Sequence, residues 1–458
     1  MPIPVTMNAW TGTEKAAGTV ADPAEWALRR ELESAPRLLA PRQIDLRNWQ
    51  DSEVGWGVVI ADGATIPAPL QALISQRRGP VFRYIKDWEY SLVLLRNYDA
   101  GKDIDINAAP RGTAPDALPQ YLLIYGAPAD VPWQLQYVLN ANRCVGRLHL
   151  TGRPLENYIN ALLTGNWSEG SGSGEVTDPN RAVVWAVDHG GGDITELMRN
   201  AIAAPLFAEL REDDQIGAGA HFLDGSAHAA DVGELVSTLA ADRPGLIVTT
   251  SHGMTGPLAD KKGMLRDLGL PVDAAGQTLA PRRLLEQWRP AGAIWYAHAC
   301  CSAGGDRESS FADLIDRDST AGKVLASVAS LGAQVAPLPT ELLGSERPLR
   351  AFIGHVEPTF DWTLQQPATG QFLTASIIEA LYGEMYVRKG DVERPIGYAF
   401  REWYGRTNGL RSQYDKAYKR FNSGEAAEGM LLALQLAARD VESTVILGDP
   451  TVAMPGLA

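Results

Sequence analysis

Apolar residues along this chain follow two alternating patterns in the second half of the sequence. Short apolar runs that stop at glycine, proline or a polar residue predict buried strands, and they cover residues 182–192, 220–225, 245–253, 293–301 and 349–358. Apolar residues at helical spacing predict helices, over residues 193–210, 230–242, 282–288, 311–332, 371–383 and 427–440. Strands joined by helix-length crossovers indicate an α/β fold, with a mainly parallel sheet covered by helices on both faces.

The first half shows the same patterns less regularly. Residues 55–62 and 120–128 predict buried strands, and residues 155–165 predict a helix that ends at a glycine. Asp193 and Glu196, at the start of the second half's first helix, have the spacing of a capping box.

A segment rich in glycine and serine separates the two halves. Residues 166–180 offer few side chains that could be buried and have a high backbone entropy, which predicts a flexible linker or an exposed loop. We therefore expect a smaller N-terminal part, residues 1–165, and a larger C-terminal part, residues 181–458.

Two of the predicted strands end at side chains that can react together. One strand ends at His252 and Gly253, and another ends at Cys300 and Cys301. In a parallel sheet the carboxyl ends of the strands meet at one edge, where functional groups gather. A histidine can activate a thiol as a nucleophile and then protonate the leaving amine, while a glycine N–H stabilises the oxyanion.

Each of these residues also has an ordinary structural role. A buried cysteine commonly acts as a small apolar core residue, and a histidine in an apolar strand is commonly structural. The pair is more informative than either residue alone, because caspase-type enzymes place their histidine roughly 50 residues before the cysteine. His298 together with the two cysteines lacks the spacing of a zinc site, so we expect no metal.

The motifs SHG and ACCSAG resemble those of caspase-like cysteine peptidases: caspases, metacaspases, legumain, gingipains, separase and the bacterial CHAT-domain proteases. In metacaspases and legumain, two residues and a glycine follow the nucleophilic cysteine, which selects Cys301 here. A caspase-type frame, with Ala299 directly before the nucleophile, selects Cys300 instead. The first frame also accounts for the following glycine, so the resemblance implies a dyad of His252 and Cys301, with Cys300 as the alternative nucleophile. It also implies an oxyanion held by backbone N–H groups near Gly253.

The resemblance extends beyond these two motifs. Residues 121–133, 144–163 and 446–455 resemble segments of gingipain-like and CHAT-like bacterial proteins. Those families can carry a non-catalytic α/β subdomain ahead of the catalytic one. The resemblance therefore implies a caspase-like catalytic domain over residues 181–458, preceded by a non-catalytic subdomain over residues 1–165.

Substrate specificity follows from acidic residues in part of this family. Metacaspases, gingipains and separase bind Arg or Lys through acidic side chains, at positions that here carry Asp188, Ala299 and Glu357. A carboxylate pairs well with the guanidinium fork of arginine, so Asp188 and Glu357 are the predicted substrate-binding residues. Ala299 departs from the acidic pattern, and either carboxylate could instead cap a strand end or lie at the surface.

Composition narrows the class of partner. The chain has 458 residues, three cysteines and a net charge of −14. Binding to phosphate backbones needs a clustered cationic surface, so nucleic acid is not expected as a direct partner. We expect no membrane association and a cytoplasmic location, because no apolar run has membrane-spanning length, no signal peptide is evident and the few cysteines suit a reducing compartment.

The expected function is that of a regulated bacterial cysteine endopeptidase that acts on proteins or peptides through a thioester acyl-enzyme, without a cofactor. Cleavage is expected after a basic residue, and an activating partner or ligand remains open. Two other classes remain. A catalytically silent caspase-like scaffold would keep its thiol buried. A thiol hydrolase or acyltransferase acting on small molecules would have an enclosed pocket instead of a peptide-length groove.

Overall fold

The computed structural model describes the backbone of residues 4–10 and 15–19, together with residues 44–167, 177–366, 369–388 and 391–457. The chain forms two compact units, Met1–Asp45 and Leu46–Ala458. In the first unit, β1 (Pro4–Trp10) and β2 (Lys15–Thr19) pair antiparallel. The second unit contains every candidate site residue named above.

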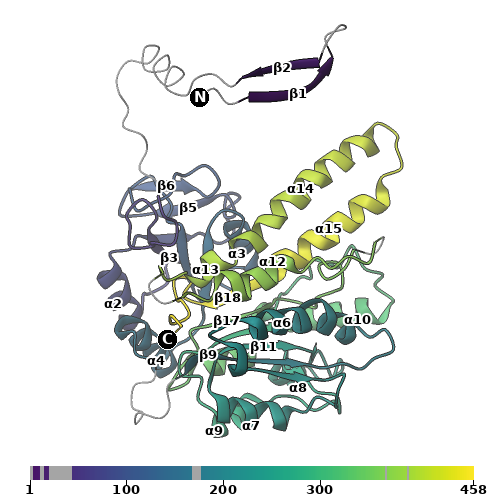
Figure 1. Ribbon diagram of the computed structural model, residues 1–458. Coiled ribbons are helices and arrows are strands. Elements are labelled where there is room, and N and C mark those ends of the chain that lie inside the picture. Colours follow the sequence, from purple (N-terminus) through teal and green to yellow (C-terminus); the bar gives the residue numbers. More distant parts are fainter. Residues whose placement is uncertain are drawn as a thin grey trace. The chain divides into compact units, whose positions relative to one another are not determined.

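One twelve-stranded sheet organises the described part of the second unit (Figure 1). Its strand order is β10-β9-β11-β14-β17-β18-β8-β7-β3-β4-β5-β6. The strands from β10 to β17 are mutually parallel, and so are those from β18 to β4. Because β17 and β18 pair antiparallel, the carboxyl ends of the two sets lie at opposite edges of the sheet.

The elements have the following bounds. The strands of the sheet are β3 (Trp56–Ala61), β4 (Val81–Tyr84), β5 (Leu94–Asn97), β6 (Lys102–Asp105), β7 (Tyr121–Tyr125), β8 (Cys144–Leu148), β9 (Asp178–Ala186), β10 (Ala220–Asp224), β11 (Pro244–Thr250), β14 (Ile294–His298), β17 (Ala351–His355) and β18 (Thr444–Gly448). Two short antiparallel pairs lie outside it: β12 (His252–Gly253) with β13 (Pro271–Val272), and β15 (Gly304–Gly305) with β16 (Gln334–Val335). The longer helices are α2 (Ala68–Arg77), α3 (Trp133–Asn140), α4 (Gly152–Thr164), α6 (Ala204–Glu212), α7 (Val232–Asp242), α10 (Thr320–Ala329), α11 (Pro337–Gly344), α14 (Arg401–Asn422) and α15 (Glu428–Ser443). Shorter helical segments are α5 (Ile194–Met198), η1 (Arg199–Ala203), η2 (Gly217–Gly219), α8 (Lys261–Asp267), α9 (Pro281–Gln287), α12 (Ala375–Ile378), η3 (Glu379–Glu384) and α13 (Ile396–Ala399).

Helices cover both faces of this sheet. On one face, contacts run from α2 through α4, α11 and α9 to α7. On the other face, they run from α6 through η3, α13 and α14 to α15, which also contacts α3. Figure 1 shows α14 and α15 side by side as a long hairpin that extends away from the sheet. The helix-length crossovers thus give the two-sided cover that the sequence pattern predicts.

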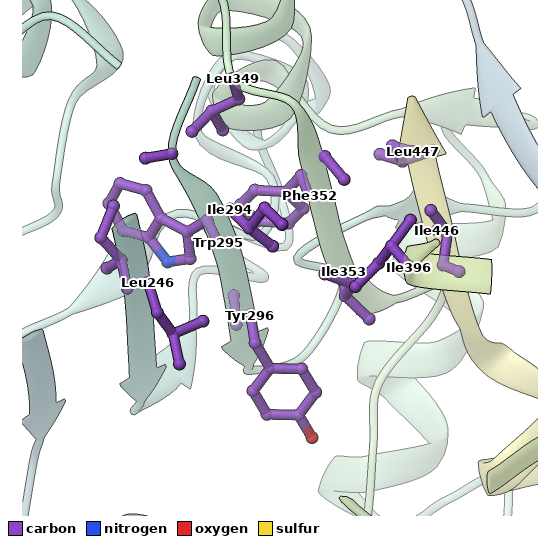
Figure 2. Packing of buried hydrophobic residues seen from close by; sticks show 14 of the residues in the cluster. Leu246, Ile294, Trp295, Tyr296, Leu349, Phe352, Ile353, Ile396, Ile446 and Leu447 are labelled. Atoms are coloured by element: carbon purple, nitrogen blue, oxygen red, sulfur yellow. The ribbon is translucent and has the colours of Figure 1, made fainter. Parts of the chain in front are cut away.

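The apolar core runs through the junction of the two sets of strands. Phe352 and Ile353 of β17 face Leu447 and Ile446 of β18 in register, and these four side chains are buried. Figure 2 shows Phe352 and Ile353 between Trp295 of β14 and the Ile446 and Leu447 side chains of β18. Burial of apolar area is the main favourable term in folding, so this junction holds the two halves of the sheet together.

Most of the predicted elements occur in the structure. Each predicted strand corresponds to an observed one, and the mainly parallel α/β class is confirmed. The helix predicted over residues 311–332 forms only from Thr320 to Ala329. Before it, Asp316 and Ser319 make local hydrogen bonds to the backbone, and Ser319 caps α10 through the N–H of Gly322. Such side chains compete with helical hydrogen bonds, which explains the late start.

The predicted linker falls inside the second unit. Its residues 168–176 lie outside the described residues, whereas Asp178–Asn180 form the start of β9. Strand β18, near the end of the chain, pairs with β8 and therefore completes the sheet of the N-terminal half. The parts before and after the linker thus share one sheet in the described structure.

Candidate active site

Four neighbouring strands carry the candidate site at their carboxyl ends. The strands β9, β11, β14 and β17 are parallel neighbours. The chain after β11 bears His252, the chain after β14 bears Cys300, and the chain after β17 bears Glu357 and Thr359. Residues far apart in sequence are therefore gathered at one edge, as expected for an open parallel sheet.

His252 is held by an aspartate that follows β9. Its Nε2 lies 3.1 Å from Asp193 Oδ1 and 3.2 Å from Asp193 Oδ2. The ring also stacks on His189, with ring centroids 5.5 Å apart and an interplanar angle of 23°. The His252 side chain is 41% exposed. The arrangement orients an imidazole at the surface of the site, with its other ring nitrogen left for another partner.

Asp193 is positioned by the turn that precedes it. Gly190, Gly191 and Gly192 all have positive φ values, a conformation that glycine adopts without strain. Asp193 then caps α5 by accepting from the N–H and the hydroxyl of Thr195. Burial raises the pKa of the Asp193 carboxyl, but the bonds from Thr195 and the nearby His252 outweigh it and leave the pKa below its ordinary value. Asp193 is therefore a carboxylate at neutral pH.

Cys300 lies at the edge of the site and is a partly exposed residue. Its thiol donates to the carbonyl of Thr359 at 3.7 Å. Burial raises the pKa of this thiol to about 11, and the charge of Asp440 acts in the same direction. In the described structure, no hydrogen bond joins Cys300 to His252. The thiol is thus held in its protonated form.

Cys301 points into an apolar cluster. Its side chain is fully buried with Met264, Leu268 and Val328. Burial raises the pKa of the Cys301 thiol well above its ordinary value. The φ of Cys301 is 56°, so the chain turns sharply directly after Cys300. In this conformation Cys301 packs as a small apolar residue, whereas Cys300 is the cysteine at the open side.

Gly253 brings the two candidate strands into direct contact. A Cβ at this position would lie 1.9 Å from the carbonyl oxygen of Cys300 and 2.9 Å from its nitrogen. Only a glycine allows so close an approach of the two backbones. The sequence assigned Gly253 to the oxyanion site, and the structure places its backbone against that of Cys300.

This contact leads to a prediction for Gly253→Ala. We expect the added methyl group to push the chain at Cys300 away and to lower the free energy of unfolding by roughly 3 kcal/mol. Urea denaturation followed by circular dichroism measures the change. Gly409→Ala is the control, because a Cβ there meets no atom within 4 Å, and alanine in a helix should be neutral or stabilising. If Gly253→Ala and Gly409→Ala had the same free energy of unfolding, the close contact between Gly253 and Cys300 would be contradicted.

The two predicted substrate-binding carboxylates are both engaged. Asp188 accepts from the N–H of Gly190 at 2.8 Å and lies 4.0 Å from the Arg199 guanidinium. Glu357 is 3% exposed and accepts from the N–H and hydroxyl of Ser310. Burial raises the pKa of Glu357, although bonds from serine side chains oppose the rise. Both residues lie at the carboxyl edge, and both stabilise loops there.

The loop that approaches Cys300 is anchored by a buried aspartate. Asp440 of α15 accepts from the hydroxyls of Thr359 and Thr363 at 2.8 and 2.5 Å, and from the N–H of Phe360 at 3.3 Å. Burial raises the pKa of Asp440 to about 6 despite these bonds. Through Thr359, helix α15 therefore fixes the acceptor of the Cys300 thiol.

Sequence reasoning missed the roles of Asp193 and Asp440. The spacing to Glu196 predicts Asp193 as a helix cap. It does not show that the same carboxylate also lies beside a histidine that follows another strand. Glu196 itself accepts from the N–H of Gly192 and not from that of Asp193, so the capping box is incomplete. Asp440 had one signal, an acidic residue in an apolar helical stretch, but its partners lie far away in sequence.

Among the described residues, no group of three or more histidine, cysteine, aspartate or glutamate side chains could hold a metal ion. Within the same residues, no helix is both long enough and apolar enough to cross a membrane.

Fold and site together define a mixed α/β protein with a histidine, an aspartate and a cysteine at neighbouring strand ends. No family model matches the chain, and no curated protein matches it. Among solved structures, it is similar to the complex of Porphyromonas gingivalis RgpB pro- and mature domains, with a TM-score of 0.43 and 12% sequence identity. The likeness covers 87% of this chain and 79% of that chain. A likeness of this extent carries no argument about activity, so the function rests on the site itself.

Proposed function

We propose that this protein is a caspase-like cysteine endopeptidase in which Cys300 is the nucleophile, His252 the general base and Asp193 the residue that orients His252. One observation carries the proposal: a histidine bound to a carboxylate and a partly exposed cysteine lie on strand ends whose backbones touch at Gly253. A nucleophile beside a base that a third group orients is the arrangement that activates a thiol.

The choice of Cys300 over Cys301 follows from burial. A nucleophile must reach its substrate, and Cys301 is fully buried among apolar side chains while Cys300 is not. The two cysteines follow β14 in a turn, and the φ of 56° at Cys301 directs its thiol into the apolar cluster while Cys300 stays partly exposed. The spacing between the nucleophile and the following glycine in related families favours Cys301. The burial of the two cysteines supports Cys300, the alternative nucleophile.

The reaction would proceed in two stages. His252 takes the proton of Cys300, and the thiolate attacks the peptide carbonyl carbon, giving an oxyanion held by backbone N–H groups near Gly253. His252 then returns the proton to the leaving amine, which leaves a thioester on Cys300. Water, deprotonated by His252, hydrolyses the thioester and restores the thiol.

The thiol must first leave the Thr359 carbonyl. At a pKa of about 11, the thiolate is scarce at neutral pH, and approach to His252 lowers this barrier. We infer that the present conformation is a resting state that a substrate or activating partner converts. The division into a catalytic region from residue 181 and a non-catalytic region before residue 166 belongs to the same proposal.

Active-site labelling tests the proposal. The wild type, Cys300→Ala and Cys301→Ala are treated with an Arg- or Lys-acyloxymethyl ketone and with an Asp counterpart, and adducts are counted by intact mass. Loss of a single adduct only in Cys300→Ala supports the assignment, and loss only in Cys301→Ala overturns the choice of cysteine. Because the carboxylates of Asp188 and Glu357 could bind a basic side chain, we expect the basic probes to react faster.

A catalytically silent scaffold is the second candidate. The raised pKa of the Cys300 thiol and its bond to Thr359 favour it. No adduct with either probe, with or without candidate activating partners, while a general thiol reagent modifies Cys300 in a separate sample, would support the scaffold over the peptidase.

Replacing Asp193 by asparagine is a prediction of the peptidase proposal. Asparagine can still cap α5, but it removes the charge that orients His252. We expect kcat to fall by about 10- to 100-fold with little change in KM or in the urea midpoint. Asp231→Asn is the matched control, because Asp231 caps α7 in the same way. If both variants lost the same activity, Asp193 would have no role beyond its cap.

A further inference from the structure

A cavity lies away from the candidate active site, at the amino ends of β7 and β8. It has a volume of about 800 Å³, which is in the range of small-molecule sites. Its walls come from the loop between β6 and β7, the residues directly before β7 and β8, and the first turns of α14. The lining residues are Leu46, Asn107, Arg111, Gln120, Asn140, Ala141, Asn142, Arg143, Arg401, Glu402, Gly405 and Arg406.

The charge of this cavity is opposite to that of the protein. Four of its lining residues are arginines, and Glu402 is the one carboxylate among the described residues that line it. The whole chain carries a net charge of −14. Four cations gathered on one concave surface of an acidic protein create a local positive potential, which attracts anions.

The guanidinium groups are held mostly by groups without charge. Arg143 is 8% exposed and donates to the carbonyls of Asn142 and Ala109 at 3.1 and 2.9 Å. Arg406 donates to the carbonyl of Leu373 at 3.0 Å. Burial, followed by the nearby charge of Arg111, lowers the pKa of Arg143. Backbone carbonyls thus position Arg143 and Arg406, and the charge of Asp440 also acts on Arg406.

Arg401 has an acidic neighbour in the wall of the cavity itself. Its guanidinium lies over the ring of Tyr398, 4.4 Å from the centroid, and 3.8 Å from Glu402. Both contacts are at the solvent side, where an ion pair contributes little. The guanidinium is therefore available to a ligand that brings more than one negative charge.

Unused polar groups lie in the same wall. Asn140 is 5% exposed, and neither its Oδ1 nor its Nδ2 has a hydrogen-bond partner among the described residues. Nε of Arg143 is likewise without a partner there. A buried polar group without a partner costs about 1–3 kcal/mol, so a ligand that satisfied these groups would recover that free energy.

We propose that this cavity is a binding site for a small molecule with phosphate groups. Arginine binds phosphate through parallel N–H···O bonds. Arg111 and Arg401 supply such forks at one concave space, and Arg143 adds its positive charge to the same wall. The buried amide of Asn140, which has no hydrogen-bond partner among the described residues, lies in the same wall. The site is independent of the peptidase proposal, because it shares no residue with the candidate active site.

Calorimetry with inorganic pyrophosphate tests the site in the full-length protein at 0.15 M salt. We expect the wild type to bind one pyrophosphate, and the double variant Arg111→Gln/Arg401→Gln to bind it at least tenfold more weakly. The double variant Arg153→Gln/Arg266→Gln makes the same change in net charge at exposed side chains elsewhere and should bind like the wild type. Arg111→Gln alone, at an exposed position, serves if the double variant fails to fold.

Two results would overturn the proposal. Wild type that takes up no pyrophosphate at 5 mM would show that the cavity is not a phosphate site. Equal weakening in the two double variants would show that binding follows net charge only. Because the readout is binding and needs no peptidase activity, these results are independent of whether Cys300 reacts.

Discussion

Replacing His252 by alanine should lower the rate of peptide hydrolysis by about 10³- to 10⁴-fold, because the thiol of Cys300 loses its base and the leaving amine its proton donor. The thiol pKa of about 11 makes this dependence strong, since little thiolate forms without help at neutral pH. Steady-state hydrolysis of a fluorogenic peptide with a basic residue before the scissile bond measures the effect.

Two comparisons make this prediction specific. His189→Ala removes the exposed ring that stacks on His252 and should retain activity within about tenfold. The double variant His252→Ala/Cys300→Ala should be no slower than Cys300→Ala, because groups that act as a unit are not additive. A larger loss in His189→Ala than in His252→Ala would mean that the wrong histidine has been assigned as the base.

The second large effect is acid destabilisation caused by two buried histidines beneath the site. His298 and His355 are fully buried, with ring centroids 4.6 Å apart. Nδ1 of His298 lies 3.0 Å from the Tyr296 hydroxyl and 3.2 Å from His355 Nε2, and His355 Nδ1 lies 3.4 Å from the Ser443 hydroxyl. Burial lowers the pKa of His298 to about 3 and that of His355 well below its ordinary value, the latter also because of His298.

The direction of the effect follows from these pKa values. Between pH 6.5 and 3 the unfolded chain binds a proton at His298 and the folded chain does not, so stability falls as the pH falls. The lowered pKa of His355 acts in the same direction. For His298 alone the loss from pH 7 to pH 4 is about 3 kcal/mol. Urea denaturation at the two pH values measures it.

A matched pair of variants separates these histidines from the other titrating groups. His298→Gln, or His355→Gln if the first does not fold, should reduce the difference in stability between pH 7 and pH 4. His228→Gln changes an exposed histidine and should leave that difference as in the wild type. If every variant kept the wild-type difference in stability between pH 7 and pH 4, groups other than His298 and His355 would cause the acid sensitivity.

How much of the fold could be predicted differs between the two halves. In the second half, strands such as β11 and β14 are continuous apolar runs that stop at a polar residue, and buried parallel strands have that pattern. The first-half strands β4, β5 and β6 have only four residues each, which is too short for a periodic signal. The pairing of β18 with β8 was also beyond prediction, because it joins segments about 300 residues apart.

The candidate site divides in a similar way. The sequence alone marks the strand ends near His252, Gly253 and the cysteine pair. An apolar run that stops at a reactive residue followed by glycine can be recognised without the structure. The positioning by Asp193 and Asp440 depends on contacts between elements, and a helix cap and a helical aspartate have no sequence pattern that names a distant partner.

The sequence by itself thus determined the α/β class and the strand ends near which the candidate residues lie, with two neighbouring cysteines as alternative nucleophiles. Only the tertiary structure decided which of the two is partly exposed. That depends on the turn at Cys301 and on the apolar side chains of α8 and α10 that bury its thiol. The arginine cavity also depends on the tertiary structure. Its arginines come from loops and a helix that are far apart in sequence, and only the packing of these elements around the sheet brings the like charges together.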